Sequence, residues 1–189
     1  MRLAPSLAPI ALLLATPALA EPLSGKDAKK ALFAPVKAEV EIMPEAGLPA
    51  DQAEVLKTVG VGQPYYGAIA IAPQEGLMSE ATVAAANFHD AAAASAAALA
   101  ECDAKKKTET ACVIAAIIRP EGWKDQGFGL SSDASAAFKD YDMKTCALAI
   151  SPMTGAFGMA AGDGAADQAV KNCGAKNDKA TDCTLVVQN

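Results

Sequence analysis

The sequence predicts an α+β fold, in which an antiparallel sheet and short alanine-rich helices form two pseudo-symmetric strand–strand–helix–strand repeats cross-linked by disulfides. Two polar segments begin and end with a cysteine at the same spacing, Cys102–Cys112 and Cys173–Cys183. An apolar, strand-like run lies ahead of each segment, GAIAIAP at 67–73 and CALAISP at 146–152. An alanine-rich stretch then leads into the first cysteine of each pair. The same elements therefore recur in the same order.

The chain opens with the features of a secretory signal peptide. Arg2 supplies a positive charge, a short apolar run follows, and residues 18–20 read Ala-Leu-Ala. A membrane-spanning helix is the alternative, but the run is shorter than the ~20 residues of a span and contains Pro9 and Pro17. We expect cleavage after Ala20, no membrane span, and a periplasmic or secreted mature protein.

The overall charge argues against several classes of partner. The chain has 16 Lys and Arg against 22 Asp and Glu, a net charge of −6. Such a chain repels phosphate backbones and anionic lipid surfaces, so we expect no nucleic-acid partner. The one basic cluster, Lys105–Lys107, lies between two cysteines, where it forms either a solvated loop or a partner contact.

Four of the five cysteines are expected to form disulfides, because export places them where disulfides persist. The number of cysteines alone leaves several disulfide pairings open. The recurring spacing favours a bridge between Cys102 and Cys112 and a second one between Cys173 and Cys183. Each bridge would close a ring of about ten residues and stabilise the fold by roughly 2–3 kcal/mol. Zinc is the alternative, but zinc sites use closer cysteine pairs or added histidines, and the chain has one histidine.

The fifth cysteine, Cys146, has no counterpart in the recurring segments. It lies in an apolar run, which favours a buried free thiol that behaves as a small hydrophobe. The alternative is a mixed disulfide or a covalent dimer through Cys146, so the oligomeric state stays open.

The first elements of the chain are predicted from the spacing of apolar residues and from the positions of proline and glycine. Residues 36–42 alternate apolar and charged side chains, which predicts a strand with one solvated face. A short helix follows, with Pro49 near its start and Gly60 past its end. Between the repeats, a helix is expected to begin at Ser131 or Ser132.

Each repeat is expected to contain a hairpin turn, a helix cap and a helix. The turns carry Gly76 and Gly155, which supply a positive φ. Asp90 and Asp163 are the expected N-caps of the alanine-rich helices. The first repeat is longer between glycine and cysteine, which we interpret as a longer second strand through 79–88.

These observations divide the chain into five segments, of which 21–189 would form one compact domain. They are a signal peptide at 1–20, an N-terminal helix–strand–helix extension at 21–64, a first repeat at 65–118, a connecting loop and helix at 119–144, and a second repeat at 145–189.

The two repeats resemble the secreted bacterial domain of unknown function 4189, here as two tandem copies. The resemblance rests on GAIAIAP and CALAISP, each followed by a glycine turn, an alanine-rich helix and a cysteine pair. It implies secretion and disulfides and no particular activity. Some similar proteins carry a 5-aminolevulinate synthase label. An exported chain of 189 residues has no room for that pyridoxal-phosphate enzyme's fold, and we expect no cofactor.

No combination of residues indicates catalysis or metal binding. His89 would need a nucleophile and an orienting acid, and its neighbour Asp90 is expected to cap a helix. Ser131 and Ser132 lack the sequence context of a nucleophile elbow. Asp140 and Asp142 form a DxD pair without the acidic loop of a calcium site. We assign no catalytic residue and no metal ligand.

Four aromatic residues form the candidate partner surface. Tyr65 and Tyr66 precede the first repeat, and Trp123 and Phe128 follow it in a glycine-rich loop. Such side chains are favoured at binding interfaces, although they would equally close the ends of a shallow core.

Three functions are compatible with these residues. The first is a non-catalytic envelope or binding protein that recognises a protein or cell-envelope partner through this aromatic region. The second is an inhibitor or immunity-type protein, whose acidic surface would suit a basic enzyme cleft. The third is a hydrolase of envelope material that uses carboxylates. We favour them in that order.

Overall fold

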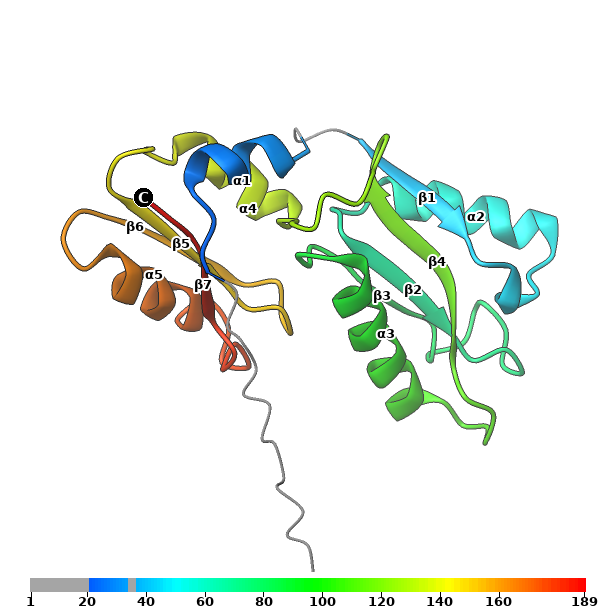
Figure 1. The fold of residues 1–189 in the computed structure, drawn as a ribbon. Helices are drawn as coiled ribbons and strands as arrows, with labels where there is room; N and C mark the ends of the chain where they lie inside the picture. Colours follow the sequence, from blue (N-terminus) through cyan, green and yellow to red (C-terminus); the bar gives the residue numbers. More distant parts are fainter. Residues whose placement is uncertain (1–20, 34–36) are drawn as a thin grey trace, which may run out of the picture.

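The computed structural model describes residues 21–33 and 37–189, and its α+β architecture confirms the predicted fold class. The predicted signal peptide, residues 1–20, lies outside the described residues. All strand pairs within the sheets are antiparallel. They form two sheets, of four and three strands, whereas the sequence analysis expects one sheet. The two sheets and their helices form two units that lie side by side (Figure 1).

The first unit is built on the four-stranded sheet, whose order is β1-β4-β2-β3. Helices α2 and α3 cover this sheet, and a short 3-10 helix, η1, follows β1 (Figure 1). The elements are β1 (Ala38–Ile42), η1 (Pro44–Ala46), α2 (Ala50–Val61), β2 (Gly67–Ile71), β3 (Val83–Ala85), α3 (Ala91–Lys105) and β4 (Val113–Pro120).

The second unit is built on the three-stranded sheet, whose order is β6-β5-β7. The N-terminal segment joins this unit, because Leu23 forms a parallel bridge to Val187 at the edge of the sheet. The elements are α1 (Gly25–Ala31), α4 (Ser132–Ala137), the 3-10 helix η2 (Phe138–Asp140), β5 (Cys146–Ile150), β6 (Phe157–Ala161), α5 (Ala165–Gly174) and β7 (Thr184–Gln188).

Strand β2, one of the two inner strands of the first sheet, is buried on both faces and alternates small and large side chains. Ala68 and Ala70 pack in a cluster with the alanines of α3. Ile69 and Ile71 pack on the opposite face with Leu56 of α2. Small side chains bring α3 close to the sheet, whereas the isoleucines fill the thicker layer beneath α2.

The same alternation sorts the two faces of β5 in the second sheet. Ala147 and Ala149 pack with Ala169 of α5. Leu148 and Ile150 lie in the opposite cluster, which also contains residues of α1, α4 and η2. In both units the alternation of alanine with a larger aliphatic residue therefore decides which layer covers each face.

Most predicted turns and caps are confirmed. Gly76 and Gly155 have positive φ, 77° and 71°. The Asp90 carboxylate accepts the Ala93 backbone N–H at the start of α3. Ser131 caps α4 in the same way, so the first of the two expected serines begins that helix.

Three predicted boundaries are wrong. Helix α2 runs to Val61, so Gly60 lies inside it, where an added Cβ would be 2.7 Å from the Val40 side chain. Helix α5 begins after Gly164 and not at Asp163, because the backbone at Gly164 has a φ of 73°, which favours glycine. The second strand of the first repeat, β3, has three residues instead of running through 79–88.

Turns explain why β3 is short. The Thr82 hydroxyl donates to the carbonyl of Leu77 (2.7 Å), and the Ala81 N–H donates to Ser79 Oγ (3.1 Å). After the strand, Asn87 has a positive φ of 65°, which ends the extended conformation. The additional residues of the first unit therefore lie mainly in the hairpin loop and in the helix.

Both predicted disulfides are present, and each has a sequence separation of 10. Each one joins its helix, α3 or α5, to the residue just before the next strand. Cys146 forms no disulfide within the described chain and is buried at the start of β5.

Candidate functional site

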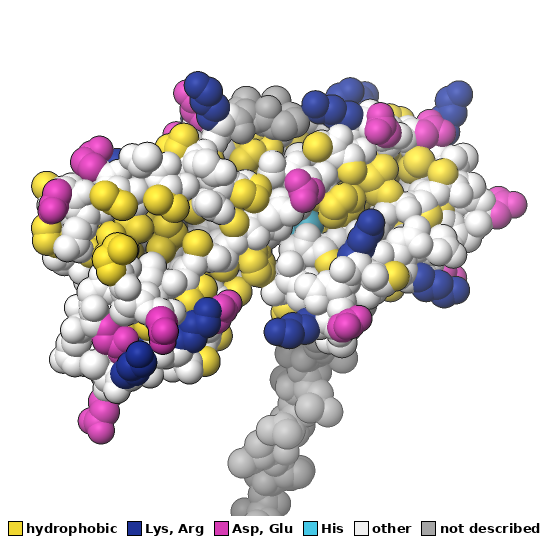
Figure 2. All heavy atoms as spheres, turned by 180° about the vertical axis from the view of Figure 1, so that it is seen from behind, with side chains coloured by type: hydrophobic (Ala, Val, Ile, Leu, Met, Phe, Trp, Pro, Cys, Tyr) yellow, Lys and Arg dark blue, Asp and Glu magenta, His cyan; other side chains and the backbone are white. Residues whose placement is uncertain are grey.

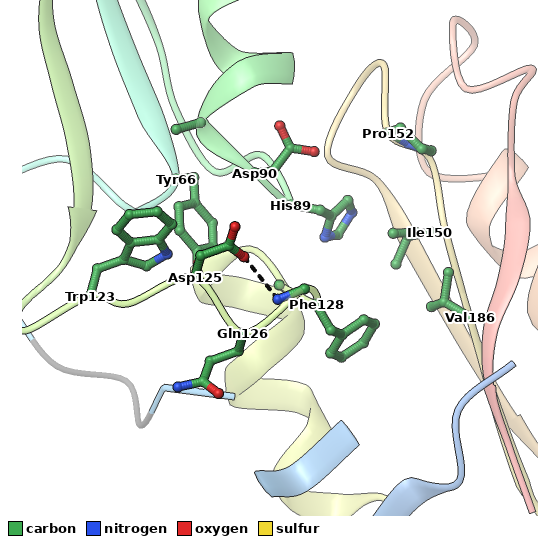
Figure 3. Close-up of a pocket in the computed structure, with 13 residues that line it drawn as sticks. Tyr66, His89, Asp90, Trp123, Asp125, Gln126, Phe128, Ile150, Pro152 and Val186 are labelled. Atoms are coloured by element: carbon green, nitrogen blue, oxygen red, sulfur yellow. Dashed lines mark hydrogen bonds between the residues drawn. The ribbon is translucent and has the colours of Figure 1, made fainter. Parts of the chain in front are cut away.

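A pocket of about 340 Å³ lies between the two units. On the face shown in Figure 2, hydrophobic side chains gather on both sides of the boundary between the units. One wall of the pocket belongs to the second unit and consists of Ile150, Pro152 and Val186 (Figure 3). The first unit and the connecting segment supply the rest of this inter-unit pocket, chiefly Tyr66, His89, Asp90, Trp123, Asp125 and Phe128.

Trp123 is held at the edge of the pocket by the end of β4. The Arg119 guanidinium lies over the Trp123 ring, 4.6 Å from its centre. Arg119 in turn pairs with Glu41 of the neighbouring strand β1 at 2.5 Å. The Trp123 backbone N–H donates to the carbonyl of Pro120 (3.1 Å), which closes a tight turn directly after β4. The pairing of β1 with β4 therefore positions the only tryptophan of the chain.

Tyr66 forms the inner surface of the pocket. Its backbone exchanges two hydrogen bonds with Phe88 (3.2 and 3.0 Å), which aligns Tyr66 with the segment that carries His89 and Asp90. Burial raises the pKa of the Tyr66 hydroxyl to about 12, although a hydrogen bond with the Trp123 side chain acts in the opposite direction. Tyr66 is therefore a neutral phenol at physiological pH.

His89 connects three parts of the chain. Its Nδ1 accepts the backbone N–H of Ser131 (3.1 Å), so Nε2 carries the proton and donates to the carbonyl of Ala156 (3.1 Å). Ser131 precedes α4, and Ala156 lies in the hairpin between β5 and β6. Burial lowers the pKa of His89, although the charges of Asp90 and Asp182 act in the opposite direction. Because both ring nitrogens are engaged, His89 is a neutral structural bridge and has no free nitrogen to act as a base.

Two carboxylates face the pocket, and the backbone fixes each of them. Asp90 Oδ1 accepts the Ala93 N–H (2.6 Å) at the N-terminus of α3. Asp125 Oδ1 accepts the Gly127 N–H (2.8 Å), as the dashed line in Figure 3 marks. Each of these bonds uses one oxygen of the carboxylate, Oδ1.

The structure brings together three of the four predicted partner-surface residues. Tyr66, Trp123 and Phe128 all line the inter-unit pocket. Tyr65 does not line it, because its side chain is 2 % exposed and forms a hydrogen bond with the Ser135 side chain. Tyr65 packs edge-on against Tyr66, with 5.6 Å between ring centres. Its placement on a partner surface is therefore wrong, and it supports Tyr66 from behind.

The sequence does not predict the remaining pocket residues as a site. His89 stands out there only as a single histidine and Asp90 as a helix cap, and no pattern singles out Asp125. Pro152 and Val186 belong to the second unit, and only the packing of the two units brings them close to the loop that carries Trp123 and Phe128. The one local signal was the glycine-rich stretch around Asp125, which indicates an exposed, tightly turning loop.

Within the described ranges, no group of three or more His, Cys, Asp or Glu could hold a metal ion, and no helix is long and apolar enough to cross a membrane. Comparison of the chain with protein-family models, with curated proteins and with solved structures finds no match. The geometry of the inter-unit pocket is therefore the main guide to function.

Proposed function

We propose that the protein is an exported, disulfide-stabilised binding protein that recognises its partner through the inter-unit pocket and does so without catalysis. Export is supported by the signal-peptide pattern of residues 1–20 and is compatible with the two disulfides. The resemblance of both repeats to the secreted domain of unknown function 4189 agrees with this location and forms part of the proposal.

The observation that carries the proposal is the convergence of distant segments on one apolar and acidic concavity. Tyr66 comes from the segment before β2, whereas Trp123 and Phe128 come from the loop after β4, and all three meet opposite the apolar wall of the second unit. Sites that bind small molecules or anchor side chains are concave and mostly apolar, with a few fixed polar groups. Aromatic side chains also provide much of the affinity of protein interfaces.

We further infer that the two units are copies of one repeated unit. The shared strand order, β3-β2-β4 and β6-β5-β7, supports this inference. So does the shared irregularity in register, which lies between Ile69 and Ala70 in one sheet and between Leu148 and Ala149 in the other. A pocket between two such units would be a natural position for a binding site, because sites often form at boundaries between packed units.

Native mass spectrometry of the exported protein tests the proposed function. The full chain is expressed in a bacterial host, the periplasmic and medium fractions are recovered, and the intact mass is measured without reduction. We expect a chain that starts at Glu21, with two disulfides and a non-covalent adduct of defined mass. Phe128→Ala and Trp123→Ala should each lower the adduct fraction about tenfold, because each removes an aromatic wall.

Met78→Ala is the matched control, because Met78 is a large apolar residue that is 95 % exposed and does not line the pocket. This variant should retain the adduct. An uncleaved chain in the cytoplasm would contradict export. An adduct that is equally abundant in all three variants would contradict the role of the pocket.

A further inference from the structure

The chemistry of the inter-unit pocket indicates the class of its ligand. We propose that the pocket binds an organic cation, a substituted ammonium group attached to a small apolar body. This inference rests on the proposed function, because it names the occupant of the same pocket.

Charge is the first argument. Asp90 and Asp125 line the pocket, and no Lys or Arg is among the residues that line it. Each carboxylate is oriented by one backbone N–H, which bonds to Oδ1. A cation would therefore meet two preoriented negative charges at the mouth of the pocket.

The N-terminus of α3 does not favour an anion here. A helix N-terminus ordinarily attracts negative charge, because its first N–H groups are unpaired. At α3, the Asp90 carboxylate already occupies this position by accepting the Ala93 N–H. An anionic ligand would also face repulsion from Asp90 and Asp125.

The aromatic side chains are the second argument. Tyr66, Trp123 and Phe128 line the pocket, and aromatic faces attract ammonium groups, most strongly when water is excluded. Tyr66 keeps its hydroxyl proton, because burial raises its pKa to about 12. The apolar wall of Ile150, Pro152 and Val186 faces this aromatic side and suits the hydrocarbon part of the ligand.

Two positive residues near the pocket could oppose a cation, Lys124, which lies between Trp123 and Asp125 in the sequence, and Arg119. Neither is among the residues that line the pocket. The Arg119 guanidinium pairs with Glu41 and lies over the Trp123 ring. The Arg119–Trp123 contact is itself a cation–π interaction. It occupies one face of the Trp123 ring.

Fluorescence of the single tryptophan tests the inference, because Trp123 lies in the pocket. The purified full-length mature protein is titrated with choline and, in parallel, with 3,3-dimethylbutan-1-ol, a neutral molecule of the same shape. Calorimetry of the same solutions provides a second readout. We expect choline to bind about tenfold more tightly than the neutral isostere, because only choline has the charge.

Substitutions of aspartate by asparagine, which remove the charge and keep the shape, test whether Asp90 and Asp125 cause the preference for choline. Asp90→Asn keeps the helix cap, since asparagine is a good N-cap residue, and Asp125→Asn keeps an oxygen that accepts the Gly127 N–H. Each variant should weaken choline binding about threefold and leave the neutral isostere unaffected. Asp142→Asn is the matched control, because Asp142 accepts the Lys144 N–H (3.1 Å) in the same type of turn and lies outside the pocket.

Comparison of choline with Nα-acetyl-lysine methylamide distinguishes a free small cation from a lysine side chain on a partner. Tighter binding of either one than of the neutral isostere supports the inference. Equal binding of choline and its isostere would overturn the cationic ligand and leave the pocket as a binding site. If no probe changed either readout, the cation would also be excluded, and the adduct measurement would separately decide the proposed function.

Discussion

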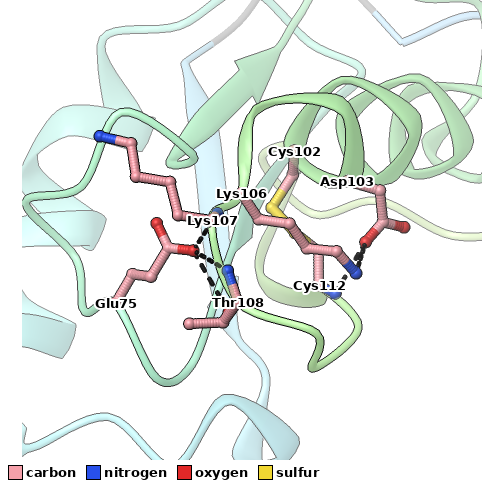
Figure 4. Close-up of polar contacts among 7 residues, drawn as sticks. All are labelled: Glu75, Cys102, Asp103, Lys106, Lys107, Thr108 and Cys112. Atoms are coloured by element: carbon pink, nitrogen blue, oxygen red, sulfur yellow. Dashed lines mark hydrogen bonds and ion pairs between the residues drawn. A yellow bond between two sulfur atoms is a disulfide. The ribbon is translucent and has the colours of Figure 1, made fainter.

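In both units a carboxylate connects the disulfide loop to the hairpin by hydrogen bonds. The carboxylate belongs to the hairpin in the first unit and to the disulfide loop in the second. In the first unit, Glu75 of the hairpin accepts the backbone N–H groups of Lys107 and Thr108 in the loop 102–112, at 2.6 and 3.0 Å (Figure 4). In the second unit, Asp182 of the loop 173–183 accepts the hairpin's Met153 N–H at 2.8 Å. The connection is therefore preserved while the residue that makes it changes sides.

The partners of the two carboxylates also differ in burial. Glu75 also accepts a hydrogen bond from the Thr108 hydroxyl (3.2 Å); Glu75 and Thr108 are half-buried, and Lys107 is exposed. Asp182 accepts a hydrogen bond from the hydroxyl of Ser151, a residue that is 0 % exposed. Loss of Asp182 would leave a buried hydroxyl without this acceptor, whereas Lys107 is exposed and Thr108 is half-buried, so the partners of Glu75 can bind water more readily.

The helices differ in how closely they approach their sheets. Gly158 of β6 pairs with Ala149, and the corresponding position in the first sheet is Val83, which pairs with Ala70. A Cβ at Gly158 would lie 2.3 Å from the Ala169 carbonyl oxygen of α5. Helix α5 therefore rests on the backbone of β6, whereas α3 rests on side chains of its sheet.

The largest expected effect is that of Gly158→Ala. The added methyl group would clash with backbone atoms of α5, which cannot rotate away, so the helix must shift. We expect the free energy of unfolding to fall by about 3 kcal/mol or more. Urea denaturation followed by circular dichroism measures this loss.

Gly62→Ala serves as the control for this substitution. Gly62 has a φ of −80°, and its nearest neighbour would be 3.5 Å from an added Cβ. It should change stability little. An unaltered unfolding free energy in Gly158→Ala would contradict the direct contact of α5 with β6.

The disulfides give the next largest effect. Both close rings of the same size, with a sequence separation of 10. The chain-entropy model therefore predicts similar losses for Cys102→Ser/Cys112→Ser and for Cys173→Ser/Cys183→Ser, about 2–3 kcal/mol each. Urea denaturation of the two double variants measures both. A much larger loss in one unit would show that its carboxylate connection cannot hold the loop without the bridge.

Local elements could be predicted from the sequence because their signals are local. The cysteine spacing, the Asp90 and Ser131 caps and the positive φ of Gly76 and Gly155 each depend on a few neighbouring residues. The division into two sheets depends on long-range pairing. Leu23 illustrates this point, because no local pattern connects it with Val187 at the other end of the chain.

The candidate site was only partly predictable for the same reason. The aromatic residues stood out by composition, but the burial of Tyr65 beside a pocket-lining Tyr66 depends on α4, which lies far along the chain. His89 was visible as the single histidine. Its role as a bridge requires the carbonyl of Ala156, which only the packing of one unit on the other supplies.

A smaller effect is expected from the carboxylate connections. Asp182→Ala should destabilise the protein by about 1–2 kcal/mol, because buried Ser151 loses its acceptor. Glu75→Ala should cost less, because none of its partners is fully buried, Lys107 being exposed and Thr108 half-buried. Urea denaturation of both variants at low and high salt makes the comparison. Equal losses in the two variants would refute the importance of burial at Ser151.

The smallest expected effect concerns His89, which belongs to the boundary between the units. Burial lowers its pKa below the ordinary value of 6.5, so the unfolded chain binds a proton more readily than the folded one. The stability that depends on the neutral ring is complete above pH 6.5 and decreases as the pH falls below 6.5 towards the lowered pKa. Between pH 7.5 and 5.5 this loss reaches at most about 1.4 kcal/mol.

His89→Gln tests this prediction, because glutamine has an acceptor and a donor but does not titrate. Across this pH range the wild-type unfolding free energy should decrease more than that of His89→Gln, as urea denaturation at each pH measures. The carboxylates with lowered pKa values, Asp27, Glu75 and Asp103, stay ionised in this range and contribute equally to both proteins. Parallel pH profiles would mean that His89 also accommodates a proton in the folded state, and that Ser131 can release Nδ1 without loosening the contact between the units.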